Sequence, residues 1–180
     1  MKNLGLKISN KEKKRIIEMH RRHANLILEQ DDDITNTTTT INNEVSTETE
    51  NRTNILDTAE DQIGVKYKWG GTKPTTGFDC SGLVTYVTGL PRKTADGFFK
   101  TMKKIENEKD VKPGDFIFFG IGSAHHAGIV KSVDENGNVL SMIHARGIKS
   151  CPGDKVTPSC KVEETVNMNW YTPILGYRRV

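Results

Sequence analysis

Four short runs of apolar, β-branched and aromatic residues occupy the C-terminal part of the chain, and they constrain its fold more than any other feature. Turn-forming sequences, Pro113-Gly114 and Asp134-Glu135-Asn136-Gly137, precede the first run and separate the second from the third. Each run has the length and composition of a β-strand, so we expect an antiparallel sheet of neighbouring segments. The runs are DFIFF (115–119), AGIVKSV (127–133), NVLSMIHA (138–145) and ILGYRRV (174–180).

Helical periodicity precedes these strands. Apolar residues recur at helical spacing up to Gly64, again from Cys80 onward, and a third time over residues 95–103. Helices followed by an antiparallel meander are typical of the α+β class. The residues that carry these patterns are Leu56, Ala59 and Ile63, then Leu83, Val84 and Val87, and then Phe98, Phe99 and Met102.

The first 53 residues differ in character from the rest. Residues 1–29 predict a basic helical arm, capped at Ser9, that either is a solvated helix or docks a protein partner. Residues 30–53 are nearly all Thr, Asn, Asp and Glu and lack periodicity, which predicts a disordered linker. We therefore expect an arm at 1–29, a linker at 30–53 and a catalytic domain at 54–180.

Charge and hydropathy exclude several function classes. The net charge is +3, and no dense Lys/Arg block with interleaved aromatics indicates nucleic-acid binding. No run approaches the roughly 20 apolar residues of a membrane span. The N-terminus has no apolar core of signal-peptide length, so we expect synthesis in the cytoplasm and, for any action outside it, another export route.

Cys80 stands between Asp79 and Ser81 where a loop becomes a helix. Asp79 is a favourable N-cap, and the helix dipole and N–H groups at that position would stabilise a thiolate. The alternative is a small buried thiol at the start of a helix. Of the three cysteines, Cys151 and Cys160 either form a disulfide or stay unpaired, and the sequence does not decide between these states.

A cysteine nucleophile needs a neighbouring base, and two strands offer histidines. His125 and His126 open one strand and His144 lies on the next, so one histidine of each strand can face the same side. The alternative hypothesis is a metal site formed by all three histidines. His125 and His126 are adjacent on a strand, however, so their side chains point to opposite faces and cannot easily bind the same ion. We expect His126 to be the base, because Gly128 on its face leaves room for a helix or substrate. His125 should be partly exposed.

Together, several stretches of residues 55–180 resemble the NlpC/p60 family of cysteine peptidases. They occur in the family's order, and the resemblance implies a papain-like α+β fold with the nucleophile on a helix packed against an antiparallel sheet. It also implies hydrolysis of bacterial cell-wall peptides without a cofactor. The stretches are YKWGG (67–71), GFDCSGLV (77–84), LPRKTAD (90–96), VKPGDFIFF (111–119), HAGIV (126–130), MIHA (142–145) and GYRRV (176–180).

By this resemblance Cys80 is the nucleophile, His126 the base and His144 the residue that orients the base. Other positions match residues that hold the substrate or the oxyanion, namely Tyr67, Ser81, Arg92, Thr94 and Asp96. Two features depart from the family pattern, Gly97 and the insert CPGDKVTPSC (151–160), and both should alter substrate choice rather than chemistry. Thr94 also has an ordinary interpretation as a helix cap.

The expected function is an endopeptidase that cuts peptidoglycan stem peptides between D-glutamate and the diamino acid. An amidase or acyltransferase with the same thiol chemistry, or a non-catalytic binding module, would keep the same fold. A wall hydrolase with a basic arm and a polar linker would suit a phage lysin, a virion-associated protein or a bacterial effector.

Overall fold

The computed structural model describes residues 36–147, 151, 157–166 and 173–180 of the chain. The chain divides into two units, residues 1–44 and 45–180. The predicted arm at 1–29 and the first residues of the predicted linker lie outside the described part. All of the candidate site residues lie in the second unit.

Helix α2 spans Asn36–Glu60, so residues 36–53 differ from the disordered linker that the sequence predicted. Neither glycine nor proline interrupts this stretch. Within the second unit, Ile55 and Ala59 are buried, and the Glu48 carboxylate lies 3.4 Å from Nζ of Lys103 and 3.8 Å from Nη1 of Arg179. These tertiary contacts stabilise a helix that composition alone does not predict.

Two short helices follow, and each is capped as its sequence predicts. Helix α3 spans Cys80–Thr88 and ends at Gly89, which adopts the left-handed conformation with φ 68°. Helix α4 spans Ala95–Thr101 and begins after the Thr94 cap. The predicted third helix therefore ends earlier than expected, because Lys103–Lys104 form strand β3. A two-stranded sheet of β1 (Thr72–Lys73) and β2 (Gly77–Phe78) leads into α3.

The main sheet has six antiparallel strands in the order β3-β8-β4-β5-β6-β7. Four of them are the strands predicted from sequence. The other two were not predicted: β3 lies where the end of a helix was expected, and β7 follows the insert at 151–160, in a stretch to which no element was assigned. The bounds are β4 Phe116–Phe119, β5 His126–Val133, β6 Val139–Arg146, β7 Lys161–Thr165 and β8 Ile174–Arg179, with a 3₁₀ helix η2 at Glu108–Asp110.

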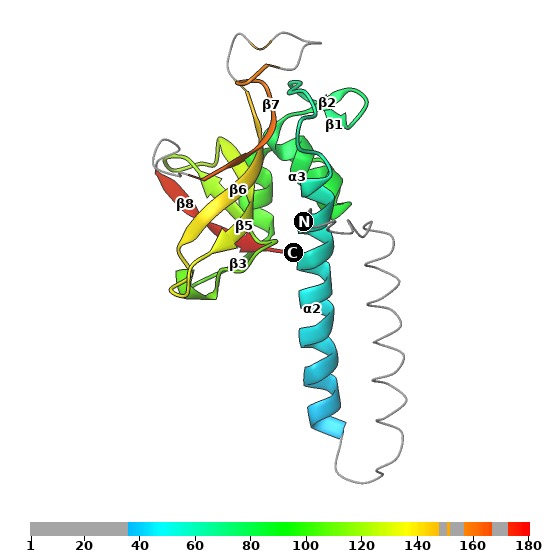
Figure 1. Cartoon of the computed structure of the whole chain (residues 1–180). Helices are drawn as coiled ribbons and strands as arrows, with labels where there is room; N and C mark the ends of the chain where they lie inside the picture. Colours follow the sequence, from blue (N-terminus) through cyan, green and yellow to red (C-terminus); the bar gives the residue numbers. More distant parts are fainter. Residues whose placement is uncertain (1–35, 148–150, 152–156, 167–172) are drawn as a thin grey trace, which may run out of the picture. The chain divides into compact units, whose positions relative to one another are not determined.

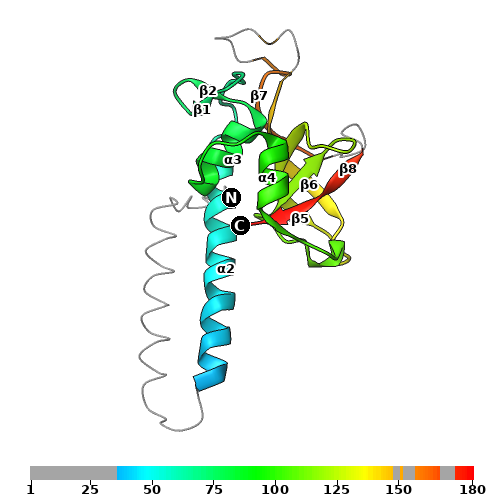
Figure 2. The same cartoon turned by 180° about the vertical axis from the view of Figure 1, so that it is seen from behind.

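The two faces of the sheet bury different side chains. One face packs against the helices, and Figures 1 and 2 show α3 and α4 beside it. Its core combines helix residues such as Leu83 and Phe98 with sheet residues such as Ile129 and Ile143. The other face buries a smaller cluster that includes Ile117, Val130 and Met142. In the first half of β5, Ala127 and Ile129 therefore belong to the core under the helices, while Val130 belongs to the smaller cluster.

The architecture confirms the predicted α+β fold, with the helix that begins at Cys80 packed against an antiparallel sheet. None of the helices in the described part of the chain combines the length and apolar character that crossing a bilayer requires.

Candidate active site

The Asp79 side chain starts helix α3. Its Oδ1 accepts a hydrogen bond from the N–H of Gly82 at 2.6 Å, and its backbone carbonyl accepts from Leu83 at 2.9 Å. This confirms the predicted N-cap and makes Cys80 the first residue of the helix.

Three further donors converge on the same buried carboxylate. The N–H of Gly70 donates to Oδ2 at 2.8 Å, Nη2 of Arg92 donates to Oδ2 at 2.7 Å, and the Ser81 hydroxyl lies 3.2 Å from Oδ1. Nη1 of Arg92 also donates to the Ser81 hydroxyl at 2.8 Å. Asp79 thus fixes the loop before β1, the segment around Arg92 and the start of α3 relative to one another.

The histidines lie on neighbouring strands, as predicted. Nε2 of His126, the first residue of β5, lies 3.0 Å from Nδ1 of His144 on β6. Nε2 of His144 in turn lies 2.9 Å from the hydroxyl of Thr165 at the end of β7. His144 is 0% exposed and His126 is 9% exposed, whereas His125 is exposed. This confirms that one histidine of each strand faces the same side and that His125 is exposed, whereas the assignment of His126 as the base stays a prediction.

Burial keeps both of these imidazoles neutral. It lowers the pKa of His126 well below its ordinary value, and the nearby His144 and His125 add to this effect. Burial also lowers the pKa of His144 to about 3, with a smaller contribution from the Arg146 guanidinium. Near neutral pH each ring therefore has one N–H donor and one bare nitrogen.

The Cys80 thiol is free, but its surroundings do not stabilise a thiolate as expected from the helix start. Burial raises its pKa, and the negative charge of Asp79 raises it further. Hydrogen bonds from the backbone N–H groups of Ala127 and Ser81 lower it by less, and Arg92 contributes least. The cap that starts the helix therefore also opposes ionisation of the sulfur. The contact with Ala127 places the thiol at the start of β5, next to His126.

Tyr67 lies near this thiol. Burial raises the pKa of Tyr67 to about 12, and the charges of Cys80 and Asp79 add to the shift, so the phenol stays protonated. Its ring packs on Gly147, where a Cβ atom would lie 2.5 Å from the ring. Its backbone N–H donates to the carbonyl of Cys160 at 2.8 Å.

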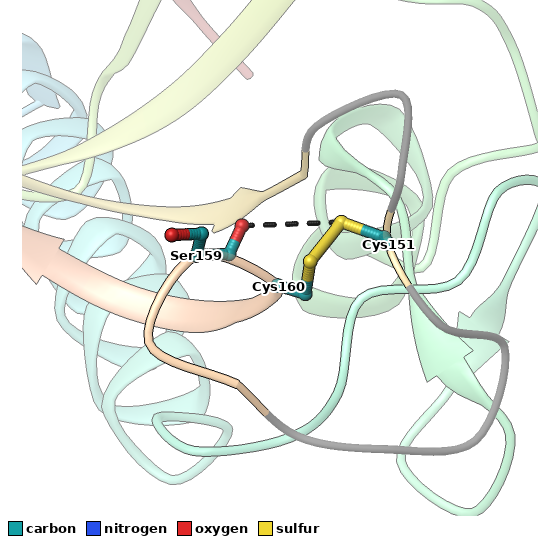
Figure 3. The surroundings of a disulfide bond; sticks show 3 residues. All are labelled: Cys151, Ser159 and Cys160. Atoms are coloured by element: carbon teal, nitrogen blue, oxygen red, sulfur yellow. Dashed lines mark hydrogen bonds between the residues drawn. A yellow bond between two sulfur atoms is a disulfide. The ribbon is translucent and has the colours of Figure 1, made fainter.

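Cys151 and Cys160 form a disulfide, which the sequence left undecided (Figure 3). Their Cα atoms are 5.6 Å apart, and Cys160 immediately precedes β7. The carbonyl of Ser159 lies 3.9 Å from the sulfur of Cys151. The bond closes the insert into a loop and anchors the strand that carries Thr165.

The other predicted site residues have intramolecular partners. The structure brings Ser81 and Arg92 together at Asp79, as described above. Thr94 caps α4 by accepting from the N–H of Gly97 at 3.1 Å, and Asp96 accepts from the N–H of Ala124 at 3.1 Å. Asp96 thereby ties α4 to the loop before His126. A direct role of these side chains in binding substrate stays a prediction.

The sequence argument about Gly128 needs correction. Gly128 does not leave room for a helix or a substrate, because a Cβ atom there would meet the sulfur of Met142 at 2.7 Å. The space is filled by a core side chain.

Within the described residues, no group of three or more His, Cys, Asp and Glu side chains has the arrangement of a metal site.

Sequence reasoning missed Thr165 altogether. Its strand, KVEET, follows the cysteine-containing insert at 151–160, in a stretch to which no element was assigned. The β-branched residues Val162 and Thr165, with two glutamates between them, could have indicated a short strand at this position.

Comparison with known proteins agrees with this geometry. The model of the NlpC/P60 family matches residues 64–174. A probable endopeptidase p60 of Listeria seeligeri is 37% identical over 105 residues, which are 52% of this chain and 20% of that protein. A gamma-DL-glutamyl hydrolase of Bacillus subtilis is 34% identical over 137 residues, which are 69% of this chain and 28% of that protein.

The solved structures include a crystal structure of the NlpC/p60 domain of the peptidoglycan hydrolase SagA. It superposes with a TM-score of 0.53 at 27% identity and covers 72% of this chain and 98% of that one. The chain spans only about a fifth to a third of the length of the curated relatives it matches. The matched region contains the cysteine, both buried histidines and Thr165, and the chain described here belongs to the NlpC/P60 family.

Proposed function

We propose that this protein is a cysteine endopeptidase that hydrolyses peptidoglycan stem peptides between D-glutamate and the diamino acid. One observation carries the proposal: the free Cys80 thiol at the start of α3 accepts a hydrogen bond from the backbone N–H of Ala127, the residue that follows His126, and Nε2 of His126 lies 3.0 Å from Nδ1 of His144. Relatives that are named endopeptidase and gamma-DL-glutamyl hydrolase support the reaction class and the γ-glutamyl bond.

Cys80 is the nucleophile in this proposal and His126 is the base. Because Nε2 of His126 contacts His144, Nδ1 is the nitrogen that takes the thiol proton. Burial raises the pKa of the thiol and lowers that of the imidazole, so the resting pair is neutral. The proton therefore moves to His126 as the sulfur attacks the peptide carbonyl, rather than beforehand.

The remaining steps use the same groups. The tetrahedral oxyanion is stabilised by the N–H of Cys80 at the helix start, and the protonated phenol of Tyr67 is a second donor. His126 then donates its proton to the leaving amine, and the acyl–sulfur intermediate forms. Water hydrolyses this thioester with His126 again acting as base. His144 holds the ring of His126 so that Nδ1 faces the sulfur.

The test uses a soluble stem peptide and mass spectrometry of the products. The proposal predicts a new amino terminus on the diamino acid. Intact sacculi that release only new termini at the muramic-acid lactyl group would instead identify an amidase.

Variants of the two adjacent histidines assign the base. We expect His126→Ala to abolish turnover and to slow alkylation of Cys80 by iodoacetamide near neutral pH. His125→Ala is the matched control, because this exposed side chain lies immediately before β5, and it should retain most activity. A dead His125→Ala together with an active His126→Ala would overturn the assignment.

A further inference from the structure

Thr165 extends the row of hydrogen-bonded groups beyond the two histidines. Its hydroxyl lies 2.9 Å from Nε2 of His144, and the side chains of both residues are buried, with Thr165 8% and His144 0% exposed. The contact crosses from β6 to β7, which are paired in the sheet. Three successive strands, β5, β6 and β7, therefore each contribute one member of the row.

The direction of these hydrogen bonds is fixed once His126 is protonated. An imidazolium has two N–H donors and no acceptor, so Nε2–H of His126 must donate to Nδ1 of His144. The neutral ring of His144 must then have its own proton on Nε2. This N–H points at the Thr165 hydroxyl, so Thr165 must act as the acceptor.

The same direction is needed before the proton arrives. If the Thr165 hydroxyl donated to His144 instead, His144 would donate to Nε2 of His126. His126 would then have its proton on Nδ1 and could not accept one from the thiol. Without an acceptor at position 165, the catalytic arrangement would lose the buried hydrogen bond that Nε2–H of His144 donates to the hydroxyl, which carries a free-energy cost.

We propose that Thr165 is a positioning residue that accepts the Nε2–H of His144 and so selects the tautomer that lets His126 work as a base. The inference rests on the function proposed above. It assigns to β7 a part in the reaction beyond completing the sheet.

The kinetic test compares Thr165→Val, which keeps the shape and removes the hydroxyl, with Thr165→Ser, which keeps the hydroxyl. Thr165→Val should lower kcat roughly tenfold to a hundredfold with KM unchanged, because the tautomer and not substrate binding is affected. Thr165→Ser should stay within about threefold of the unchanged protein, since the acceptor remains.

A matched control removes a different hydroxyl from the same sheet. Ser132 shares a 2.7 Å hydrogen bond with Ser141 and takes no part in the histidine row. Ser132→Ala should therefore leave kcat unchanged. Equal losses of activity in Ser132→Ala and Thr165→Val would show a general effect on the sheet and overturn the proposal.

Alkylation of Cys80 by iodoacetamide gives a readout that needs no substrate. Thr165→Val should slow it in the unchanged background but have no further effect in a His144→Gln background, because the hydroxyl acts through His144. If peptide hydrolysis is absent while Thr165→Val still slows alkylation, the proposed substrate fails and the role of Thr165 stands. If Thr165→Val alkylates as fast as the unchanged protein, the role of Thr165 is refuted.

Discussion

Acidification should destabilise the folded protein through its two buried histidines. Burial lowers the pKa of His144 to about 3 and that of His126 well below its ordinary value. In the unfolded chain the pKa of each of these side chains returns to about 6.5. Below pH 6.5 the unfolded state therefore binds protons that the folded state excludes, so the free energy of unfolding falls as the pH falls.

The size of this effect follows from the number of protons. One proton bound only by the unfolded state changes the free energy of unfolding by about 1.4 kcal/mol per pH unit. Two histidines give about 2.7 kcal/mol per pH unit once the pH is well below 6.5. This stability is fully present above pH 6.5, and the loss continues until the lowered folded-state pKa values are reached. The free energy of unfolding of a native domain is only about 5–15 kcal/mol in total, so this effect is large.

Urea unfolding at several values between pH 7.5 and pH 5 measures this slope. The window stays above the range where most carboxyl groups titrate. His144→Gln should remove about half of the slope. A slope of the unchanged protein below about 0.7 kcal/mol per pH unit between pH 6 and pH 5 would refute the reasoning, because it is less than one histidine supplies.

Three further changes test other parts of the structure. Cys151→Ser should lower the free energy of unfolding by about 2.5 kcal/mol, because it opens the short disulfide loop, and an unchanged urea midpoint would contradict this. Asp115→Ala should lower it by about 3–5 kcal/mol, because the buried carboxylate pairs with Arg179 at 2.8 Å, and a loss below 1 kcal/mol would show that the pair is dispensable. Gly147→Ala should reduce kcat/KM at least about tenfold by displacing the Tyr67 ring, which a cleavage assay measures, and an unaffected rate would exclude Tyr67 from the site.

The parts of the site that the sequence predicted are those determined by local chemistry. A cap residue before an apolar helix placed Cys80, and strand alternation separated His126 from His125. Both depend on residues within a few positions of each other. The pairing of His126 with His144 followed from the short turn between their strands.

The parts that the sequence did not predict depend on contacts between distant segments. Helix α2 extends over residues 36–53, whose polar composition predicted a linker, and Glu48 in this segment contacts Lys103 and Arg179. The raised pKa of the Cys80 thiol comes from burial and from Asp79, so the residue that caps the helix also disfavours the thiolate. Thr165 joins the site only because β7 pairs with β6.

Hydrolysis of a defined stem peptide by the full chain is the most direct test of the proposed activity. The unchanged protein should release a fragment with a new amino terminus on the diamino acid, and the acyl group should be trapped on Cys80 by rapid quenching and mass spectrometry. Cys80→Ala should be folded and inactive. Equal cleavage by Cys80→Ala, or cleavage with no adduct on Cys80 and no loss after its alkylation, would contradict the account.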